Sequence, residues 1–316
     1  VDSAAAEAIA AGARRSFNEV LDEAARPGAR PRGFALRQRA RVTQAAATET
    51  RFSSPNVVAV LPGTDPALAN EYVLLMAHLD HIGIREGGEG DRIRNGAMDN
   101  ASGIATLLEV ARTMSRPENR TRRPVLIAAV TAEEKGLLGA DFMARHPVVD
   151  GRVVGVVNLD MPVLTYNFED VIAFGAEHST MGPTVARAAA RMGVGLIPDP
   201  LPEQGLFTRS DHYRFVQQGV PSVFLMTGFG GEGRERFTHF LSTNYHQPSD
   251  DLSLPFNWEA AARFARLNYL IAREIADAPE APLWYADSFF GTAFGGGQRR
   301  AERPASQGQA AARGAR

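Results

Sequence analysis

Apolar residues along the chain form short continuous runs separated by polar and Gly-rich segments. Five runs are predicted to be strands, at residues 57–61, 72–77, 124–131, 153–159 and 220–226. Apolar runs without polar alternation are typical of a mostly parallel sheet that is buried on both faces. The hydrophobic pattern therefore predicts a sheet-centred domain.

Between these runs, apolar positions follow the helical period instead. Helices are predicted at 211–218 and 258–275, and a further helix follows residue 103. The apolar face of that helix is formed by Ile104, Leu107, Leu108, Ala111 and Met114. Strands that alternate with helices predict an α/β fold with three layers, αβα, around a mostly parallel central sheet.

The two ends of the chain differ from this middle part. Residues 3–25 are rich in Ala and Glu and have a helical composition, whereas residues 294–316 are rich in Gly, Ala, Gln and Arg and are predicted to be disordered. We predict an N-terminal helical and extended lead-in at 1–55, a main domain at 56–280, and a C-terminal extension at 281–316 that is disordered at its end.

Composition narrows the possible chemistry. Lys and Arg total 34 against 36 Asp and Glu, so a net charge of −2 gives no overall attraction to nucleic acid or to an anionic membrane. No apolar run approaches the length of roughly 18 residues that a membrane span requires. The absence of cysteine excludes disulfides and thiolate catalysis, and it leaves His, Asp and Glu as the strong metal ligands.

Polar residues follow three of the predicted strands directly. His78 ends the strand at 72–77, Glu133 and Glu134 follow the strand at 124–131, and Asp160 follows the strand at 153–159. In parallel sheets, functional side chains collect at the carboxyl ends of the strands. If Glu133 and Glu134 lie in extended chain, they point to opposite sides, so that one carboxylate can bind a metal while the other faces a water.

Taken singly, each candidate also has an ordinary structural explanation. His78 could simply end its strand, although Asp80, two positions on, could accept the Nδ1 proton of that imidazole and orient it. Asp99 could be the N-cap of the helix that follows, Glu133 and Glu134 a solvated acidic turn, and His246 part of a turn-rich loop. Their convergence on one predicted sheet edge is therefore what favours a metal site.

Ser210, Asp211 and His212 contain the residue types of a serine-protease triad but stand consecutively. A triad needs side chains that converge from separate elements, so a helix cap with a buried, hydrogen-bonded His is the better interpretation. No role is predicted for the remaining histidines, which are His81, His146, His178 and His239.

The chain resembles the M28 family of metallopeptidases, which includes bacterial zinc aminopeptidases. The resemblance runs from about Asn56 to Ala276, and motif residues appear in the order of the family. The stretches that carry it are Ala77-His78-Leu79-Asp80, Asn95-Gly96-Ala97-Met98-Asp99-Asn100-Ala101-Ser102-Gly103, Thr131-Ala132-Glu133-Glu134-Lys135-Gly136-Leu137-Leu138-Gly139, Asn158-Leu159-Asp160, Ser210-Asp211-His212-Tyr213-Arg214-Phe215 and Tyr245-His246-Gln247-Pro248-Ser249-Asp250.

This resemblance implies the phosphorylase/hydrolase-like fold of zinc exopeptidases and a site for two zinc ions. Asp99 would bridge the ions, with His78 and Asp160 on one, and Glu134 and His246 on the other. Glu133 would be the general base for a bridging hydroxide. Tyr245 would either donate to the oxyanion or serve as a packing aromatic. Cobalt or manganese could replace zinc on this ligand set.

The activity implied is an aminopeptidase acting on peptides or small aminoacyl substrates. A carboxypeptidase or dipeptidase would need a cation for the substrate carboxylate, for which Arg209 is the candidate. A glutaminyl-cyclase-like acyltransferase would use a single zinc, and a non-catalytic binding domain would not need Glu133. Apolar Met161, Phe207 and Phe229 indicate a hydrophobic pocket. The oligomeric state is not indicated.

Many members of the family carry a protease-associated domain upstream or inserted, and residues 1–55 resemble the segment that follows such a domain. The resemblance alone therefore implies that the protein is exported, periplasmic or secreted, with a signal segment upstream of Val1.

Overall fold

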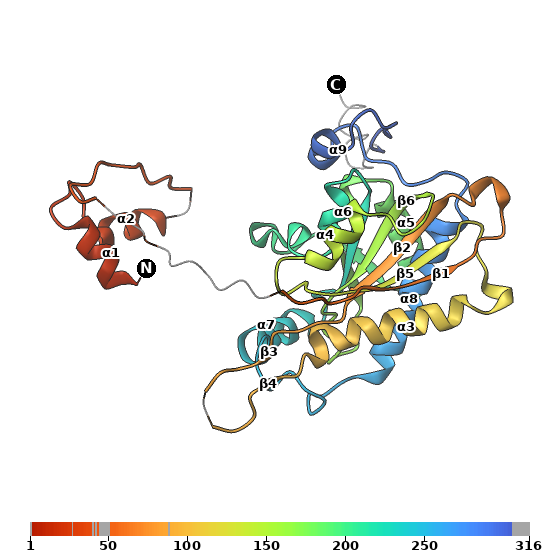
Figure 1. Cartoon of the computed structure of the whole chain (residues 1–316), viewed down its shortest axis with the longest axis horizontal. Coiled ribbons are helices and arrows are strands. Elements are labelled where there is room, and N and C mark those ends of the chain that lie inside the picture. The colour runs from red at the N-terminus through yellow and green to blue at the C-terminus, as the bar shows by residue number, and fades with distance from the viewer. Residues whose placement is uncertain are drawn as a thin grey trace, which may run out of the picture. The chain divides into compact units, whose positions relative to one another are not determined.

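The computed structural model describes two compact units, Val1–Phe52 and Ser53–Arg316. The residues described are 2–26, 28–39, 41, 43, 51–87 and 89–304. Within them, no helix combines the length and the apolar character needed to cross a membrane. Figure 1 shows the elements of both units, and the second unit contains the predicted sheet.

Seven strands form the central sheet of the second unit. They are β1 (Val57–Leu61), β2 (Glu71–His78), β5 (Val125–Val130), β6 (Arg152–Leu159), β7 (Asp170–Phe174), β8 (Gly195–Ile197) and β9 (Ser222–Thr227). Their order across the sheet is β1-β5-β2-β6-β9-β7-β8. The β1–β5 and β7–β9 pairs are antiparallel and the other four neighbouring pairs are parallel, which confirms the mostly parallel sheet.

Helices cover both faces of this sheet, as Figure 1 shows, and so complete the three αβα layers. Helices α3, α5 and α8 pack together on one face, whereas α4 and α6 pack together on the other. The helices of the unit are α3 (Ser102–Met114), α4 (Leu138–Arg145), α5 (Met181–Ala190), α6 (His212–Val216), α7 (Gly233–Thr243), α8 (Trp258–Asp277) and α9 (Phe289–Phe294).

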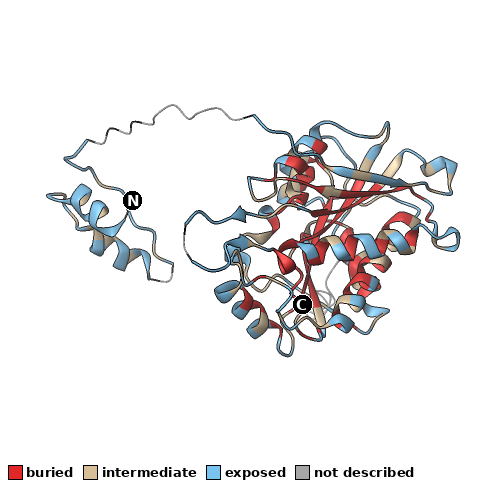
Figure 2. Cartoon of the chain, turned by 60° about the horizontal axis from the view of Figure 1, so that its bottom comes forward, coloured by how far each residue is buried: buried red, intermediate tan, exposed pale blue. Residues whose placement is uncertain are grey.

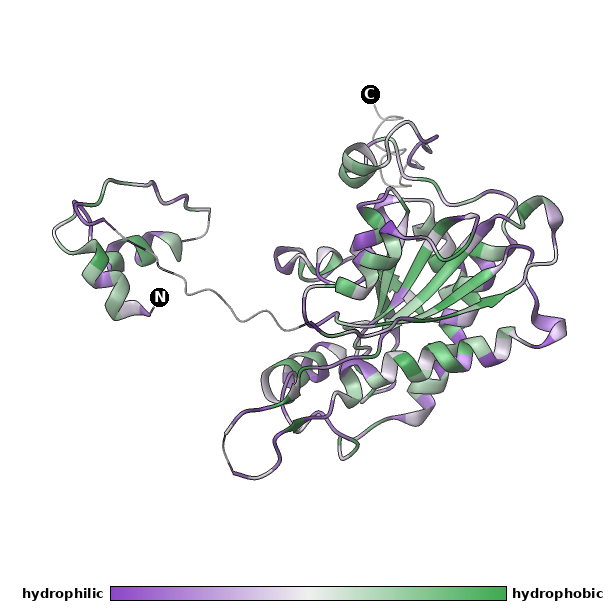
Figure 3. Ribbon diagram, viewed as in Figure 1, coloured by the Kyte–Doolittle hydropathy of each residue, from purple (hydrophilic) through white to green (hydrophobic). Residues whose placement is uncertain are grey.

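Alternate residues of the strands supply the two cores of the sheet. In β2, Val73 and Leu75 belong to the larger cluster beneath α3, α5 and α8, whereas Leu74 and Met76 belong to the smaller cluster beneath α4 and α6. All four side chains are fully buried. Each such side chain contributes about 1.5–3 kcal/mol to stability. Figures 2 and 3 show the strands as the most buried and most hydrophobic part of this unit.

Several elements were not predicted. The strands β7 and β8 and the helices α4, α5 and α7 lie in segments for which the hydrophobic pattern gave no prediction. Two short strands were also not predicted, β3 (Gly83–Ile84) and β4 (Ile93–Arg94), which pair as a two-stranded sheet. These elements are short, so few apolar positions reveal their period.

The N-terminal unit contains two helices where a single helical segment was expected at 3–25. They are α1 (Ser3–Ala10) and α2 (Phe17–Ala24). Gly12 takes a positive φ of 73° in the break between them. Ser16 starts α2 with a capping box, in which its hydroxyl accepts the Glu19 N–H while the Glu19 carboxylate accepts the Ser16 N–H.

The expectation of disorder from residue 294 onward is wrong for 294–304. Tyr285 pairs with Ala301 in a β-bridge, and Arg303 binds the Asp287 carboxylate through two nitrogens at 2.8 and 3.0 Å. A bidentate pair of this kind orders an arginine that composition alone would assign to a solvated tail. The rest of the predicted disordered end, 305–316, lies outside the described residues.

Candidate metal and catalytic site

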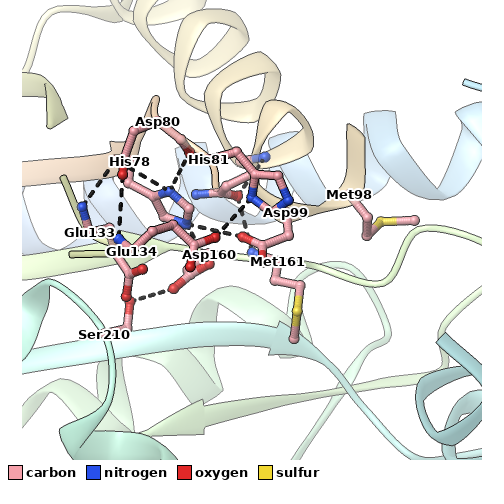
Figure 4. Close-up of polar contacts among 12 residues, drawn as sticks. His78, Asp80, His81, Met98, Asp99, Glu133, Glu134, Asp160, Met161 and Ser210 are labelled. Atoms are coloured by element: carbon pink, nitrogen blue, oxygen red, sulfur yellow. Dashed lines mark hydrogen bonds and ion pairs between the residues drawn. The ribbon is translucent and has the colours of Figure 1, made fainter. Parts of the chain in front are cut away.

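The ends of three neighbouring parallel strands hold most of the predicted site. His78 is the last residue of β2, Glu133 and Glu134 lie in the turn after β5, and Asp160 follows β6. Because β2 pairs with both β5 and β6 in parallel, these three ends lie at one edge of the sheet. Figure 4 shows the resulting cluster of side chains.

The first group consists of His78, Asp99 and Asp160. The His78 Nε2 atom lies 3.2 Å from Asp99 Oδ1 and 3.2 Å from Asp160 Oδ1. All three residues are buried. Ligand atoms of the three lie within 4.8 Å of one another, close enough to hold one metal ion.

The second group is arranged around the other oxygen of Asp99. His246 Nε2 lies 3.3 Å from Asp99 Oδ2 and 3.4 Å from Glu134 Oε2. His246 comes from the loop after α7 and has a positive φ of 59°, a backbone conformation that is uncommon for His. All five predicted ligands therefore come together, with one Asp99 oxygen facing each histidine.

His81, for which no role was predicted, also reaches this second group. Its Nδ1 atom lies 2.8 Å from Glu134 Oε1, and its ring meets the His246 ring edge-on, with centroids 5.6 Å apart. His81, Asp99 and Glu134 offer ligand atoms within 4.8 Å of one another. The sequence signal that could have found it is its place three residues after His78, at the same strand end.

The polar atoms of the second group fit a metal ion. His246 Nε2, Glu134 Oε1 and both ring nitrogens of His81 are buried and form no hydrogen bond of regular geometry with the described residues, although His81 Nδ1 and His246 Nε2 closely approach carboxylate oxygens. Buried polar atoms are normally hydrogen-bonded, and imidazole nitrogens with carboxylate oxygens are a donor set suited to zinc. The residues present therefore match the chemistry of such an ion.

Asp80 has a different role from the one predicted. Its carboxylate accepts the N–H groups of Glu133 and Glu134, at 3.0 and 3.3 Å, as Figure 4 shows. The distance from His78 Nδ1 to Asp80 Oδ1 is 3.8 Å, too long for the predicted hydrogen bond, and Nδ1 pairs instead with the Asp80 carbonyl oxygen at 3.1 Å. Asp80 therefore fixes the Glu133–Glu134 turn.

Asp99 lies in an irregular helical turn, Ala97–Ala101, that two other side chains hold in place. The Asp250 carboxylate accepts the Met98 and Asp99 N–H groups at 2.7 and 3.0 Å. The N-cap residue of α3 is Ala101, and the side chain that accepts an N–H of its first turn, from Gly103, is that of Asn100 and not that of Asp99. The N-cap explanation for Asp99 is thus wrong, and its carboxylate is free for the two histidines.

Glu133 stands beside the first group in a largely apolar pocket. The prediction that Glu133 and Glu134 lie in extended chain is wrong, because the chain forms a turn there. Gly136 and Leu137 donate their N–H groups to the Glu133 carbonyl. Burial, followed by the negative charge of Asp160, raises the pKa of the Glu133 carboxyl to about 9. A divalent cation at the first group would lower that pKa.

Contacts with the histidines lower the pKa of the Asp99 carboxyl, in contrast to the raised pKa of Glu133. Burial by itself works to raise the pKa of Asp99, but the close approach of the His246 and His78 ring nitrogens lowers it overall. Two neighbouring carboxyl groups therefore differ in their affinity for a proton. Asp99 stays ionised, which is the form that could bind a metal ion, while Glu133 readily takes up a proton.

Ser210 belongs to the site, although not as a nucleophile. Its hydroxyl donates to Asp160 Oδ2 at 2.5 Å, drawn in Figure 4, and accepts the Asn158 side-chain N–H at 2.7 Å. The predicted helix cap is absent, because Asp211 makes no capping bond and both of its oxygens lack a partner among the described residues. His212 is fully buried and packs against Phe207, with ring centroids 5.1 Å apart.

We expect Asp211→Asn to stabilise the metal-free protein increasingly as pH rises. Burial raises the pKa of Asp211 to about 8, so between an unfolded pKa of about 3.9 and that value the folded state holds a proton that the unfolded state has lost. Wild-type stability then falls by up to about 1.4 kcal/mol per pH unit, whereas the amide does not titrate. Thermal unfolding at pH 5 and pH 8 measures the difference.

His212 is present in both proteins, so its own titration cancels in this comparison. One kcal/mol corresponds to about 2–4 °C in Tm for a chain of this size. A difference in Tm that is the same at both pH values would contradict a buried, protonated Asp211.

A pocket of about 520 Å³ opens beside the first group and Glu133. Its wall is mostly apolar, and Arg209 and Arg234 also line it. Of the three residues predicted to form a hydrophobic pocket, Met161 and Phe229 line this one, whereas Phe207 is buried elsewhere in the core. The apolar lining residues are Met161, Leu201, Leu206, Phe224, Met226, Phe229, Phe237 and Leu241.

Tyr245 lines the same pocket next to the second group. Its ring stacks on the His246 ring, with centroids 3.8 Å apart. Burial, and next the charge of Asp99, raises the pKa of Tyr245 above its usual value. The phenol therefore stays protonated and keeps an O–H donor at the pocket wall.

Comparisons with known proteins agree with the geometry. A family model described as Peptidase family M28 matches residues 56–272. Aminopeptidase Y of Saccharomyces cerevisiae is 27% identical over 249 residues, which cover 76% of this chain and 40% of that protein. A probable zinc metalloprotease of Pyricularia oryzae is 30% identical over 223 residues, which cover 58% of this chain and 43% of that protein.

A solved structure extends this similarity to the fold. An aminopeptidase from Aneurinibacillus sp. strain AM-1 aligns with a TM-score of 0.53 and 25% identity, covering 72% of this chain and 48% of that one. The chain therefore spans less than half the length of each of these relatives.

Proposed function

The chain belongs to peptidase family M28, and on this basis we propose that it is a zinc aminopeptidase with two metal ions. One ion would be held by His78, Asp99 and Asp160, and the other by Asp99, Glu134 and His246. Two of the relatives named above are aminopeptidases and a third is named a probable zinc metalloprotease, which supports this reaction class.

The observation that carries the proposal is the position of the Asp99 carboxylate. Oδ1 faces His78 at 3.2 Å and Oδ2 faces His246 at 3.3 Å. A carboxylate that offers one oxygen to each of two ligand groups is suited to bridge two cations. Zinc ions bound there would polarise the scissile carbonyl and increase the acidity of a water molecule.

Glu133 is proposed as the general base. Its carboxylate lines the pocket beside the first group, where it can accept a proton from the attacking water and return it to the leaving amine. Asp80 holds the Glu133 and Glu134 backbone, so it positions the base and a ligand together. Ser210 fixes Asp160 in the same way.

Tyr245 is proposed to donate its O–H to the oxygen that develops negative charge on the scissile carbonyl. Its place at the pocket wall and its protonated phenol support this role. His81 is a further candidate ligand on the Glu134 side, given its 2.8 Å approach to that carboxylate.

The activity is tested with aminoacyl substrates and their N-blocked counterparts on zinc-loaded protein. We expect hydrolysis of leucine p-nitroanilide but not of its N-acetyl derivative, because an aminopeptidase must bind a free α-amine. Metal analysis of the same sample is expected to give two zinc ions per chain.

Other results identify the alternative reactions. Release of C-terminal residues from N-blocked peptides would replace the aminopeptidase with a carboxypeptidase. One zinc per chain together with cyclisation of N-terminal glutamine would favour the glutaminyl-cyclase-like acyltransferase. Export of the protein, which rests on the family resemblance, stays a prediction that detection of the full-length protein outside the cytoplasm would test.

A further inference from the structure

Two arginines stand at the rim of the pocket that opens on the metal site. Arg209 follows the short 3₁₀ turn Leu206–Thr208, and Arg234 lies in the first turn of α7. Both side chains are exposed, whereas the pocket wall behind them includes the buried Met226 and Phe237. The pocket thus joins an apolar wall to a cationic rim.

Neither of these two guanidinium groups has an anionic partner among the described residues. Within the part of the chain that the structure describes, the Arg209 side chain makes no hydrogen bond or ion pair, and Arg234 makes only a cation–π contact, 5.0 Å above the Phe229 ring. By contrast, Arg236, two residues further along α7, is held by Glu232 at 2.6 Å. A guanidinium carries five N–H donors, and no acceptor in the described part of the chain occupies those of Arg209 or Arg234, so they are available to a ligand.

The carboxylates of the pocket do not neutralise the rim. Its lining contains three acidic residues, which are Asp99, Glu133 and Asp160, and all three belong to the metal and catalytic groups. The pocket is therefore lined both by the carboxylates of the metal and catalytic groups and by two arginines that have no anionic partner within the described chain. A molecule that fills the pocket can contact both.

We propose that Arg209 and Arg234 bind a carboxylate of the peptide substrate, so that the enzyme prefers short peptides with a free acid beyond the cleaved bond. This inference rests on the proposed aminopeptidase function and names its substrate class. The carboxylate is either the C-terminus of a short peptide or an acidic side chain, since both present the same group to a guanidinium.

The size and chemistry of the pocket support a short peptide. A volume of about 520 Å³ is within the range of sites that enclose one small molecule. Arginine offers paired donors that match the two oxygens of a carboxylate. Because both arginines are exposed at the rim, their attraction to the substrate is expected to weaken as salt is added.

The experiment compares the full-length zinc-loaded enzyme on matched substrates. Leu-Gly-Gly and its C-terminal amide isolate the terminal carboxylate, and Leu-Glu-Gly amide and Leu-Gln-Gly amide isolate an acidic side chain. Each pair is assayed with the wild type, Arg209→Gln, Arg234→Gln and the double variant. Arg236→Gln is the matched control, because this arginine lies on the same helix but is paired with Glu232.

We expect the ratio of kcat/KM for acid over neutral substrate to be about tenfold in at least one pair, and to fall toward one in the double variant. Arg236→Gln should leave the ratio unchanged. A ratio near one in the wild type, or a ratio that survives the double substitution, overturns the inference while leaving the aminopeptidase intact. No hydrolysis of any of the four peptides would instead refute the proposed function.

Binding without turnover provides a second readout. Calorimetry with the Glu133→Ala protein should show tighter binding of Leu-Gly-Gly than of its amide, and the difference should vanish when Arg209 and Arg234 are also replaced. Equal binding of the acid and the amide by protein that retains both arginines would contradict the binding of a substrate carboxylate by Arg209 and Arg234.

Discussion

Replacing Glu133 by alanine is expected to reduce kcat by about 10²- to 10⁴-fold, the range for loss of a positioned general base. Its carboxylate faces the pocket, and burial gives it a pKa of about 9 in the absence of cations, so it is able to receive a proton. Initial rates on leucine p-nitroanilide, measured on protein of known zinc content, give the effect.

The zinc content is the control for this substitution. Glu133 is not among the proposed ligands, so Glu133→Ala and Glu133→Gln should both keep the zinc of the unchanged protein. Tyr245→Phe removes only an O–H donor and is expected to cost no more than about 10²- to 10³-fold. A Glu133 variant with a near-normal rate would show that another group is the base.

Replacing Asp99 by alanine is expected to remove most of the bound zinc from the protein. Each Asp99 oxygen faces a different ligand histidine, so one substitution opens both groups. A metal site that loses one of so few charged ligands loses much of its affinity, and in the proposed arrangement two sites would share that ligand. Zinc per chain after dialysis, with competition against a chelator, measures the loss.

Asp65→Ala is the matched control for Asp99→Ala. Asp65 is a carboxylate at the opposite edge of the sheet, where it binds Arg122 at 2.7 Å, and its loss should leave zinc unchanged. His246→Ala and His81→Ala then show which of these histidines binds the second ion, because only replacement of the true ligand should lower the zinc content to about one per chain. An Asp99→Ala protein with unchanged zinc would contradict the bridge.

The strand ends of the site could be predicted because they follow from a simple rule of parallel sheets. Continuous apolar runs end at His78, before Glu133 and before Asp160, and parallel pairing brings such ends to one edge. His246 lies in a loop with no periodicity, so its place came from the family resemblance alone.

The parts that could not be predicted depend on how turns fold back. His81 reaches Glu134 only because the chain reverses after β2, and the Asp80 carboxylate meets Glu133 rather than His78 because the chain turns after β5. Neither turn leaves a periodic pattern in the sequence. Arg234 is similar, because its place at the pocket depends on the start of an α7 helix that the hydrophobic pattern did not reveal.

The hydrogen bonds that the Asp250 carboxylate accepts from the Asp99 turn limit when this turn can form during biosynthesis. Asp250 accepts the N–H of a residue 151 positions earlier in the chain. A ribosome releases His78, Asp99, Glu134 and Asp160 well before it releases Asp250. The nascent chain therefore cannot complete the turn that carries Asp99 until synthesis has passed Asp250, so the candidate metal site can form only after that point.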